Sequence, residues 1–350
     1  MGDFIHIPRG VDLIEIRKKE ARIIAKARSK AKPEKCILCG KPQTSFCNSH
    51  SVPMMVLRSI ADKGKVLLSL ALVGFDREIH DIELGVKASG TFHYICENCD
   101  NTFFQDYEND KNIIMKPNEK MLAEIAVKNY LLQLSKCSLE KELYTILQRQ
   151  YNILSDFQKL MATKNTDLAE FEAEVRFHQN IACNNLTGQY NILFWKVLPY
   201  TVPIATQSTF VLNKDIEGTK IINIYDENPN IRMQYMHLAI FPFNGESVVL
   251  LYHHKRDREY RRLAHQLNSI SEDKILIYIN YLVFKFTDNY FVSHKIENEI
   301  NTNAKLQALS REYDDRPSLG ILNFSNNYGR DYTPIASDDI PNFLSPEWAI

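Results

Sequence analysis

The amino-acid sequence predicts an α+β protein in which a cysteine-bearing lobe, a helical segment and a mixed α+β C-terminal domain follow one another. Residues 34–112 are rich in cysteine and turn residues, residues 118–187 repeat apolar side chains at helical spacing, and residues 190–252 hold short β-rich runs. A chain of 350 residues has room for two or three domains. The segments that we expect are 1–33, 34–112, 113–187 and 188–350.

The composition excludes several classes of protein. Lys and Arg number 42 against 43 Asp and Glu, so the chain is neither a uniformly basic nucleic-acid coat nor an acidic solvating chain. Seven cysteines are too few for a disulfide scaffold, and no apolar run is long enough to span a bilayer. We therefore expect a cytoplasmic protein with no membrane partner, in which paired cysteines act as metal ligands.

The first expected element is a basic helix over residues 11–32, which Pro33 ends. Nine Lys or Arg residues against two Glu between Arg17 and Lys35 give this part a local net charge of +7. Two interpretations stay open, a solvated surface helix and an arm that binds phosphates. The candidate nucleic-acid contacts are Arg17, Lys18, Lys19, Arg22, Lys26 and Arg28.

The next lobe contains two CxxC pairs, Cys36/Cys39 and Cys96/Cys99. Two residues between the cysteines let both sulfurs of a pair face one ion, and four thiolates form a tetrahedral structural zinc site. Gly40 suits the tight turn that follows the first pair. The sequence therefore predicts one structural Zn²⁺ held by these four cysteines, with Cys47 as the only other cysteine near enough to compete.

The rest of this lobe and the segment after it are expected to contain strands and then helices. Apolar runs in residues 66–90 predict strands or an inserted loop, and a short helix is expected from about Asn101. Asn118 is a plausible N-cap for the first long helix. Further helical segments are expected at 139–150 and 155–181, with apolar faces that pack in the core.

The C-terminal domain is expected to begin with strands and to return to helix. The predicted strands are 192–195, 209–212, 221–225 and 247–252. A helix is predicted over 257–290, and the last forty residues are polar, punctuated by prolines and expected to be partly irregular. The basic stretch at 253–262 has two interpretations, a contact for phosphates or an anionic ligand and a solvated helix start.

The residues between the two cysteine pairs resemble the HNH endonuclease family. His50-Ser51-Val52-Pro53 matches the H-x-[IV]-P step that zinc-bearing members place between two CxxC pairs. The run Phe103 to Glu108 is similar to the sequence that follows the second pair in a bacterial branch with an SH-x-[IV]-P step. The resemblance covers about residues 34–110 and implies a ββα-metal finger, often of treble-clef type.

The resemblance also implies the roles of individual residues. His50 would be the general base that takes a proton from the water attacking a phosphodiester. A divalent cation, Mg²⁺ or Mn²⁺, would bind a phosphate oxygen, and Asn101 falls where the last N or H of the family often ligates that ion. Asp100 is the neighbouring candidate ligand. Many members carry Asp or His directly before the general base, but that position here is Ser49.

These features support three functions. The first is an HNH endonuclease that cuts DNA, with the C-terminal half providing recognition or control, as in bacterial restriction and phage-defence effectors by analogy. The second is a non-catalytic zinc finger that binds nucleic acid, and the third is a protein adaptor. The expected partners are nucleic acid, with DNA favoured over RNA, a second copy in a homodimer, and a regulatory ligand or protein at the C-terminal domain.

Overall fold

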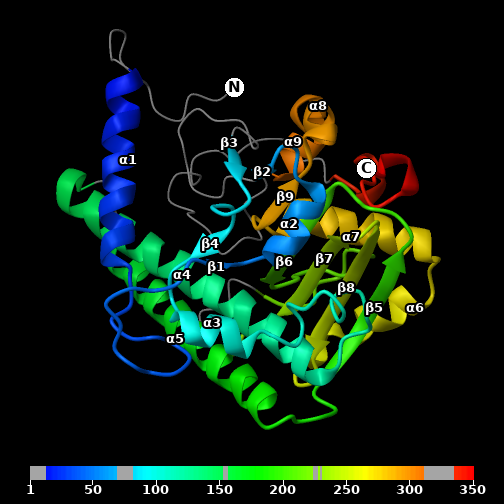
Figure 1. Ribbon diagram of the computed structural model, residues 1–350, viewed down its shortest axis with the longest axis horizontal. Helices are drawn as coiled ribbons and strands as arrows, with labels where there is room; N and C mark the ends of the chain where they lie inside the picture. Colours follow the sequence, from blue (N-terminus) through cyan, green and yellow to red (C-terminus); the bar gives the residue numbers. More distant parts are fainter. Residues whose placement is uncertain (1–12, 69–81, 153–156, 224–227, 229–230, 311–334) are drawn as a thin grey trace.

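The computed structural model describes residues 13–68, 82–152, 157–223, 228, 231–310 and 335–350, and it has a mixed α+β architecture. A seven-stranded sheet lies between two groups of helices, with α4 and α5 on one face and α6 and α7 on the other (Figure 1). The predicted fold class is therefore confirmed at the level of α+β.

The large sheet contains strands from both ends of the chain. Its order is β3-β2-β9-β6-β7-β8-β5, and all its pairings are antiparallel. The strands are β2 (Lys65–Leu68), β3 (Ile82–Gly85), β5 (Tyr190–Leu198), β6 (Ile204–Phe210), β7 (Met236–Phe243), β8 (Glu246–His254) and β9 (Tyr290–Val292). The cysteine-bearing segment therefore contributes a hairpin, β2–β3, to the sheet of the C-terminal segment.

The helices of the described residues include those that cover the two faces of this sheet and others, such as the first, that pack elsewhere. They are α1 (Leu13–Lys30), α2 (Met54–Ile60), α3 (Glu97–Phe103), α4 (Glu119–Tyr151), α5 (Phe157–Cys183), α6 (Arg261–Asn268), α7 (Glu272–Phe286), α8 (Glu297–Thr302) and α9 (Ala304–Ser310). Short 3₁₀ turns are η1 (Arg258–Tyr260), η2 (His294–Ile296), η3 (Ser337–Asp339) and η4 (Pro346–Trp348). Across the described residues, we find no helix whose length and hydropathy would let it cross a membrane.

Alternating side chains of β7 divide the core into two halves. Leu238 and Ile240 belong to the apolar cluster shared with α7, whereas Ala239 and Phe241 belong to the cluster shared with α4. Successive residues of a strand point to opposite faces, so a central strand covered on both sides is buried throughout. All eight residues of β7 are buried, as this arrangement requires.

Several elements agree with the sequence. The basic helix ends at Lys30, shortly before Pro33, and its predicted start at residue 11 lies outside the described residues. The Asn118 side chain accepts a hydrogen bond from the amide of Met121 at 2.9 Å, so the predicted N-cap is confirmed. The helix that it begins differs from expectation because α4 is continuous for 33 residues and does not restart at 139.

Other boundaries are corrected. The short helix begins at Glu97 and not near Asn101, because its N-cap is Cys96 of the second CxxC pair. The predicted helix over 257–290 is divided into η1, α6 and α7, and it gives way to β9 at Tyr290. In the last forty residues, 311–334 lie outside the described residues, and 335–350 contain only two 3₁₀ turns between irregular stretches, as the prolines indicated.

Two strands differ from those predicted: one predicted strand is a loop, and one strand of the large sheet was not predicted. The strand predicted at 221–225 is wrong for residues 221–223, whose amides at Ile221 and Ile222 both bond to the carbonyl of Asn213 in a loop, and 224–225 lie outside the described residues. The strand β7 has no counterpart among the predicted strands. Pro242 lies in it and argues against a central strand, but it sits at the hairpin end, opposite Ser247.

The cysteine-bearing lobe is fastened to β9. The Ser51 hydroxyl donates a hydrogen bond to the Asn289 side chain at 2.9 Å. Gly90 has φ +62°, and a Cβ there would lie 2.5 Å from Cζ of Phe291 in β9. Only glycine therefore permits this close approach of the lobe to the sheet.

Candidate functional site

The four predicted cysteines come together in one cluster. The sulfurs of Cys36, Cys39, Cys96 and Cys99 all lie within 4.8 Å of one another, and those of Cys39 and Cys96 are 3.9 Å apart. A zinc ion with sulfurs at about 2.3 Å in tetrahedral geometry separates the sulfurs by about 3.8 Å. The donor set and its spacing therefore fit one structural zinc ion.

Local backbone geometry brings the two pairs together. The first pair lies in a tight hairpin in which the amide of Gly40 bonds to the carbonyl of Cys36 at 2.8 Å, and Gly40 has φ +70°. The second pair begins α3, and the amide of Cys96 points at the sulfur of Cys36 at 3.4 Å. A hairpin followed by a helix start thus presents two sulfurs from each side.

The electrostatics of the four sulfurs are uneven. Burial raises the pKa of the Cys36 and Cys99 thiols, whereas a hydrogen bond from the Lys41 backbone lowers the pKa of Cys39 to about 7. Thiolate is the form that binds zinc, so metal binding must displace protons from the buried pair. The affinity of this site for zinc is therefore expected to rise with pH.

The remaining cysteines stay outside the cluster. The Cys47 thiol donates to the carbonyl of Ile95 at 3.2 Å, and burial raises its pKa to about 12. Cys137 is buried against α5, and Cys183 is exposed at the end of that helix. Cys47 therefore does not compete as a ligand in this arrangement.

His50 lies in a short β-ribbon beside the cysteine cluster. Strand β1 (Ser49–His50) pairs antiparallel with β4 (Thr91–Phe92), and α3 begins shortly after β4 ends. The long interval between β1 and β4 contains α2 and the hairpin β2–β3, which joins the large sheet. The unusually wide spacing of the two CxxC pairs is thus explained by elements inserted between two strands.

The His50 ring is held by a backbone carbonyl. Its Nε2 lies 3.0 Å from the carbonyl oxygen of Val86, directly after β3. Since a carbonyl only accepts, Nε2 carries the hydrogen and Nδ1 is left as the basic nitrogen. Burial lowers the pKa of His50 from its ordinary value. The neutral ring that accepts protons is thereby the form favoured near neutrality.

The candidate cation ligands are only partly assembled around His50. The Ser49 hydroxyl donates to Oδ1 of Asp100 at 2.6 Å, so it orients the carboxylate and offers no negative charge of its own. Asn101 follows on α3 with an exposed side chain that makes no hydrogen bond among the described residues. Of the three predicted ligands, Ser49 and Asp100 are hydrogen-bonded to each other, and the Asn101 side chain is not bonded to either of them in the described part of the chain.

Sequence reasoning missed one functional candidate, Lys128. This residue of α4 is 1% exposed, forms an ion pair with Glu108, and places Nζ 3.6 Å from Oδ1 of Asp100. The same ammonium lies 4.0 Å from the centroid of the Phe104 ring. The available signal was a lysine within the apolar stretch of a helix, a position where a charge needs a partner. Only the folded chain shows that its partners are 20 and 28 residues away.

The basic helix α1 presents its charges to solvent. Arg22, Lys26 and Arg28 are exposed, and Lys18 and Lys19 also lie on the surface, while Ala27 is buried. The side chain of Arg17 lies outside the described residues. The end of the helix is tied to the cysteine-bearing lobe by a hydrogen bond from the Tyr94 hydroxyl to the carbonyl of Ala31 at 2.8 Å.

Two arginines of the basic stretch at 253–262 form ion pairs with carboxylates of the same chain. Arg256 pairs with the buried Glu174 of α5. Arg262 bonds to Asp215 at 2.9 Å and to Glu217 at 2.5 Å. Arg262 is 53% exposed, in agreement with a solvated helix start, whereas Arg256 is 27% exposed and is held by a buried carboxylate.

Comparison with protein-family models, curated proteins and solved structures finds no match to this chain. The geometry of the site is therefore the basis on which a function can be proposed.

Proposed function

We propose that this protein is a metal-dependent endonuclease of HNH type that hydrolyses phosphodiester bonds in DNA. The observation that carries the proposal is the position of His50. It lies in a two-stranded ribbon whose second strand is followed by the helix that carries the second cysteine pair. A backbone carbonyl fixes the tautomer of its ring. This order of strand, strand, helix and cysteine pairs is what a zinc-bearing ββα-metal finger of treble-clef type requires.

The chain's own residues account for proton transfer in this mechanism. Nδ1 of His50 takes the proton from a water molecule as that water attacks phosphorus, and the Val86 carbonyl stabilises the imidazolium that results. Burial keeps the imidazole neutral before the reaction. The cysteine cluster holds α3 against the ribbon and thereby fixes the distance from His50 to Asp100.

A hard divalent cation fits the site through Asp100. One oxygen of this carboxylate accepts from Ser49, and the side chain is 23% exposed, so an ion from solvent can reach it. A carboxylate oxygen is the ligand that Mg²⁺ prefers. Bound Mg²⁺ or Mn²⁺ would neutralise charge on the phosphate and on the leaving 3′ oxygen. Asn101 is the second candidate ligand that the family resemblance suggests.

Replacing His50 with alanine is expected to reduce cleavage of plasmid DNA in Mg²⁺ or Mn²⁺ by about 10²- to 10⁴-fold, the usual contribution of a general base. The rate is measured under single-turnover conditions, together with zinc content and melting temperature to show that the variant is folded. A matched control is His294→Ala, which removes another partly exposed histidine that pairs with Glu83 outside the ribbon. Equal cleavage by the parent and His50→Ala, or no cleavage by the parent, would contradict the proposal.

The basic helix is expected to supply part of the affinity for DNA. Replacing Arg22, Lys26 and Arg28 together with glutamine removes three exposed charges, because none is buried in the fold. Every phosphate that is no longer neutralised by a cation lowers the slope of log K against log salt by about 0.9. The slope for the triple variant should therefore be smaller by about 2 to 3, as measured by fluorescence anisotropy over a salt series.

The control for this measurement replaces three exposed cations elsewhere, Arg149, Lys220 and Lys305, with glutamine. It changes the net charge by the same amount and is expected to leave the slope nearly unchanged. An equal loss of slope in both variants would mean that net charge alone, and not the helix, attracts DNA.

A non-catalytic zinc finger that binds nucleic acid is the second candidate function, and one observation favours it. The ammonium of Lys128 already compensates the charge of Glu108 and Asp100, and Ser49 adds no carboxylate. The parent protein would then shift the mobility of DNA without cutting it. His50→Ala would shift DNA to the same extent as the parent.

A further inference from the structure

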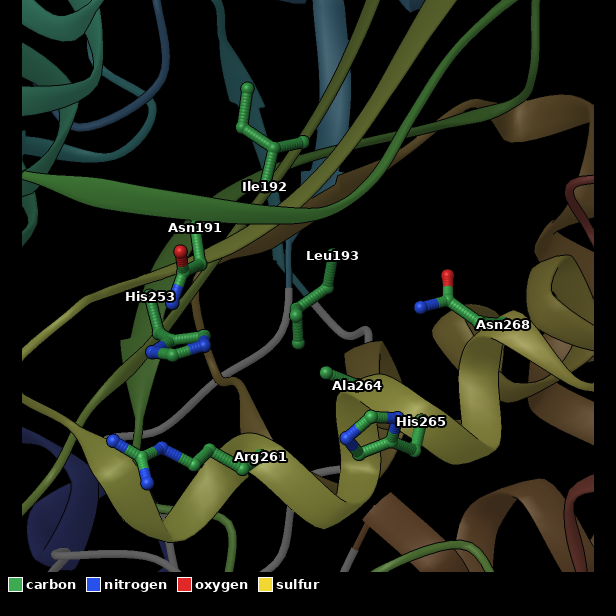
Figure 2. A pocket seen from close by; sticks show the side chains of 8 residues that line it. All are labelled: Asn191, Ile192, Leu193, His253, Arg261, Ala264, His265 and Asn268. Carbon is green, nitrogen blue, oxygen red and sulfur yellow. The ribbon is translucent and has the colours of Figure 1, made fainter. Parts of the chain in front are cut away.

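A cavity of about 330 Å³ opens between the edge of the large sheet and α6, far from His50 in the sequence. Figure 2 shows side chains from β5, β8 and α6 around it. Its volume is at the lower end of the range for small-molecule sites, about 300–1,000 Å³. The lining residues are Asn191, Ile192, Leu193, His253, Arg261, Ala264, His265 and Asn268.

No carboxylate of the described residues neutralises the cationic side of the cavity. Arg261 makes no ion pair among the residues that the structure describes, although its neighbour Arg262 is bonded to both Asp215 and Glu217. The eight lining residues include no acid. One helical turn further, His265 lies on the same face of α6 as Arg261 (Figure 2). An exposed cation without a partner beside a cavity is suited to an anionic ligand.

His253 provides the second, independent observation. Its side chain is 2% exposed, and its Nδ1 lies 2.8 Å from the carbonyl oxygen of His254, so that Nδ1 carries the hydrogen. Its Nε2 then has a free lone pair and no hydrogen-bond partner in the described part of the chain, yet the ring lines the cavity (Figure 2). A ligand in the cavity that donates a hydrogen bond can therefore use this lone pair.

The remaining walls fit a molecule with both polar and apolar parts. The amides of Asn191 and Asn268 offer donors and acceptors, and neither is engaged in a side-chain hydrogen bond within the described ranges. Leu193 and Ala264 give apolar surface between them. A ligand complementary to these side chains has an anionic group to pair with Arg261 and a hydroxyl to donate to Nε2 of His253. It also has a further polar edge to bond to the side-chain amides of Asn191 and Asn268.

We propose that this cavity binds a small phosphorylated molecule with hydroxyl groups, of the size and chemistry of a ribonucleoside monophosphate. The phosphate contacts Arg261 and His265, and a hydroxyl donates to His253. This site is separate from the proposed nuclease centre and stands whether or not the protein cuts DNA.

The test measures binding of four ribonucleoside monophosphates, of ribose 5-phosphate and of inorganic phosphate to the full chain by calorimetry, up to roughly 1 mM ligand, a concentration that detects weak small-molecule binding. At least one nucleotide is expected to bind more tightly than inorganic phosphate, because inorganic phosphate has no ribose hydroxyl to donate to His253. Replacing Arg261 with glutamine should weaken that binding about 10- to 100-fold, the loss expected for a hydrogen bond to a charged group.

Arg262→Gln is the matched control, since it removes the adjacent arginine whose charge is already paired. It should leave the affinity within about twofold of the parent, because a paired surface charge contributes little to a neighbouring site. Binding of ribose 5-phosphate as tightly as the nucleotide would support the phosphate and hydroxyl contacts without the base. Failure of every probe to bind, tighter binding of inorganic phosphate, or equal losses in the two arginine variants would overturn the proposal.

Discussion

Replacing Cys36 with serine is expected to abolish zinc binding and to unfold the lobe around His50. Cys36 is buried, accepts the amide of Cys96, and provides one of four sulfurs within 4.8 Å of one another. Structural zinc contributes about 10–16 kcal/mol of binding free energy in small fingers, and that energy is folding energy. The zinc content should fall from about one ion per chain to none, and proteolysis should cleave the lobe at rates far above those of the parent.

The matched control is Cys183→Ser, which removes an exposed thiol outside the cluster and should keep one zinc per chain. The unfolding is expected to be local because the apolar cluster between the large sheet and α7 contains none of the four cysteines. A Cys36→Ser protein that keeps its zinc and its resistance to protease would show that the four cysteines are not a metal site. Treating the parent with a strong chelator should cause the same loss of zinc and the same faster proteolysis as in the variant. This treatment separates the effect of losing the metal from the effect of losing the Cys36 side chain.

Buried histidines are expected to destabilise the folded protein as the pH falls from about 7 to about 5. His178, His237 and His254 pack between α5 and the sheet with at most 6% of their surface exposed. Burial lowers the pKa of all three, and for His254 it does so to about 3, with the charges of neighbouring groups adding to the effect. The folded protein therefore keeps these rings neutral where the unfolded chain protonates them.

The sign of this effect follows from proton uptake. Below about pH 6.5 the unfolded chain binds protons that the folded chain does not. The free energy of unfolding therefore decreases as the pH is lowered. For His254 the loss reaches about 2 kcal/mol at about pH 5. Glu124 and Glu170 act in the opposite direction, because burial raises their pKa to about 8 and about 7 and their folded forms hold protons.

A variant isolates the contribution of one histidine from these opposing groups. In His254→Asn the side-chain oxygen can still accept the amide of Arg256, which bonds to Nδ1 of His254 at 3.0 Å, but it cannot titrate. Urea unfolding at about pH 7.5 and about pH 5 should show that the parent loses about 2 kcal/mol more than this variant. Equal losses would mean that His254 is protonated in the folded protein.

The parts of the fold that follow from local rules were predictable from the sequence. The N-cap at Asn118 is one such case, since its amide side chain and the apolar spacing after it are both local signals. The four cysteines are another, because the CxxC spacing within each pair indicates that both sulfurs can bind one metal ion. The strand β7 was not predictable in this way because Pro242 is a strong local signal that tertiary pairing overrides.

For the site around His50, the sequence predicted the identity of the candidate reacting residues but not the groups that orient and neutralise them. The orienting carbonyl belongs to Val86, and a backbone oxygen leaves no trace in residue type. Lys128 meets Asp100 across two helices, a contact that depends on how α3 and α4 pack and on no pattern along the chain. Sequence reasoning named the candidate reacting groups, while the groups that orient and neutralise them became visible only in the structure.

The continuous sheet has a consequence for the order in which the protein is made. The Val86 carbonyl that holds His50 follows β3, which pairs with β2, and β2 is held in the sheet by β9. The strand β9 follows β2 by more than half the chain, so it leaves the ribosome long after the cysteines and His50. A nascent or truncated chain that lacks Tyr290–Val292 cannot complete this support. Under the nuclease function proposed above, the activity would be withheld from the cell until synthesis of the chain is nearly finished.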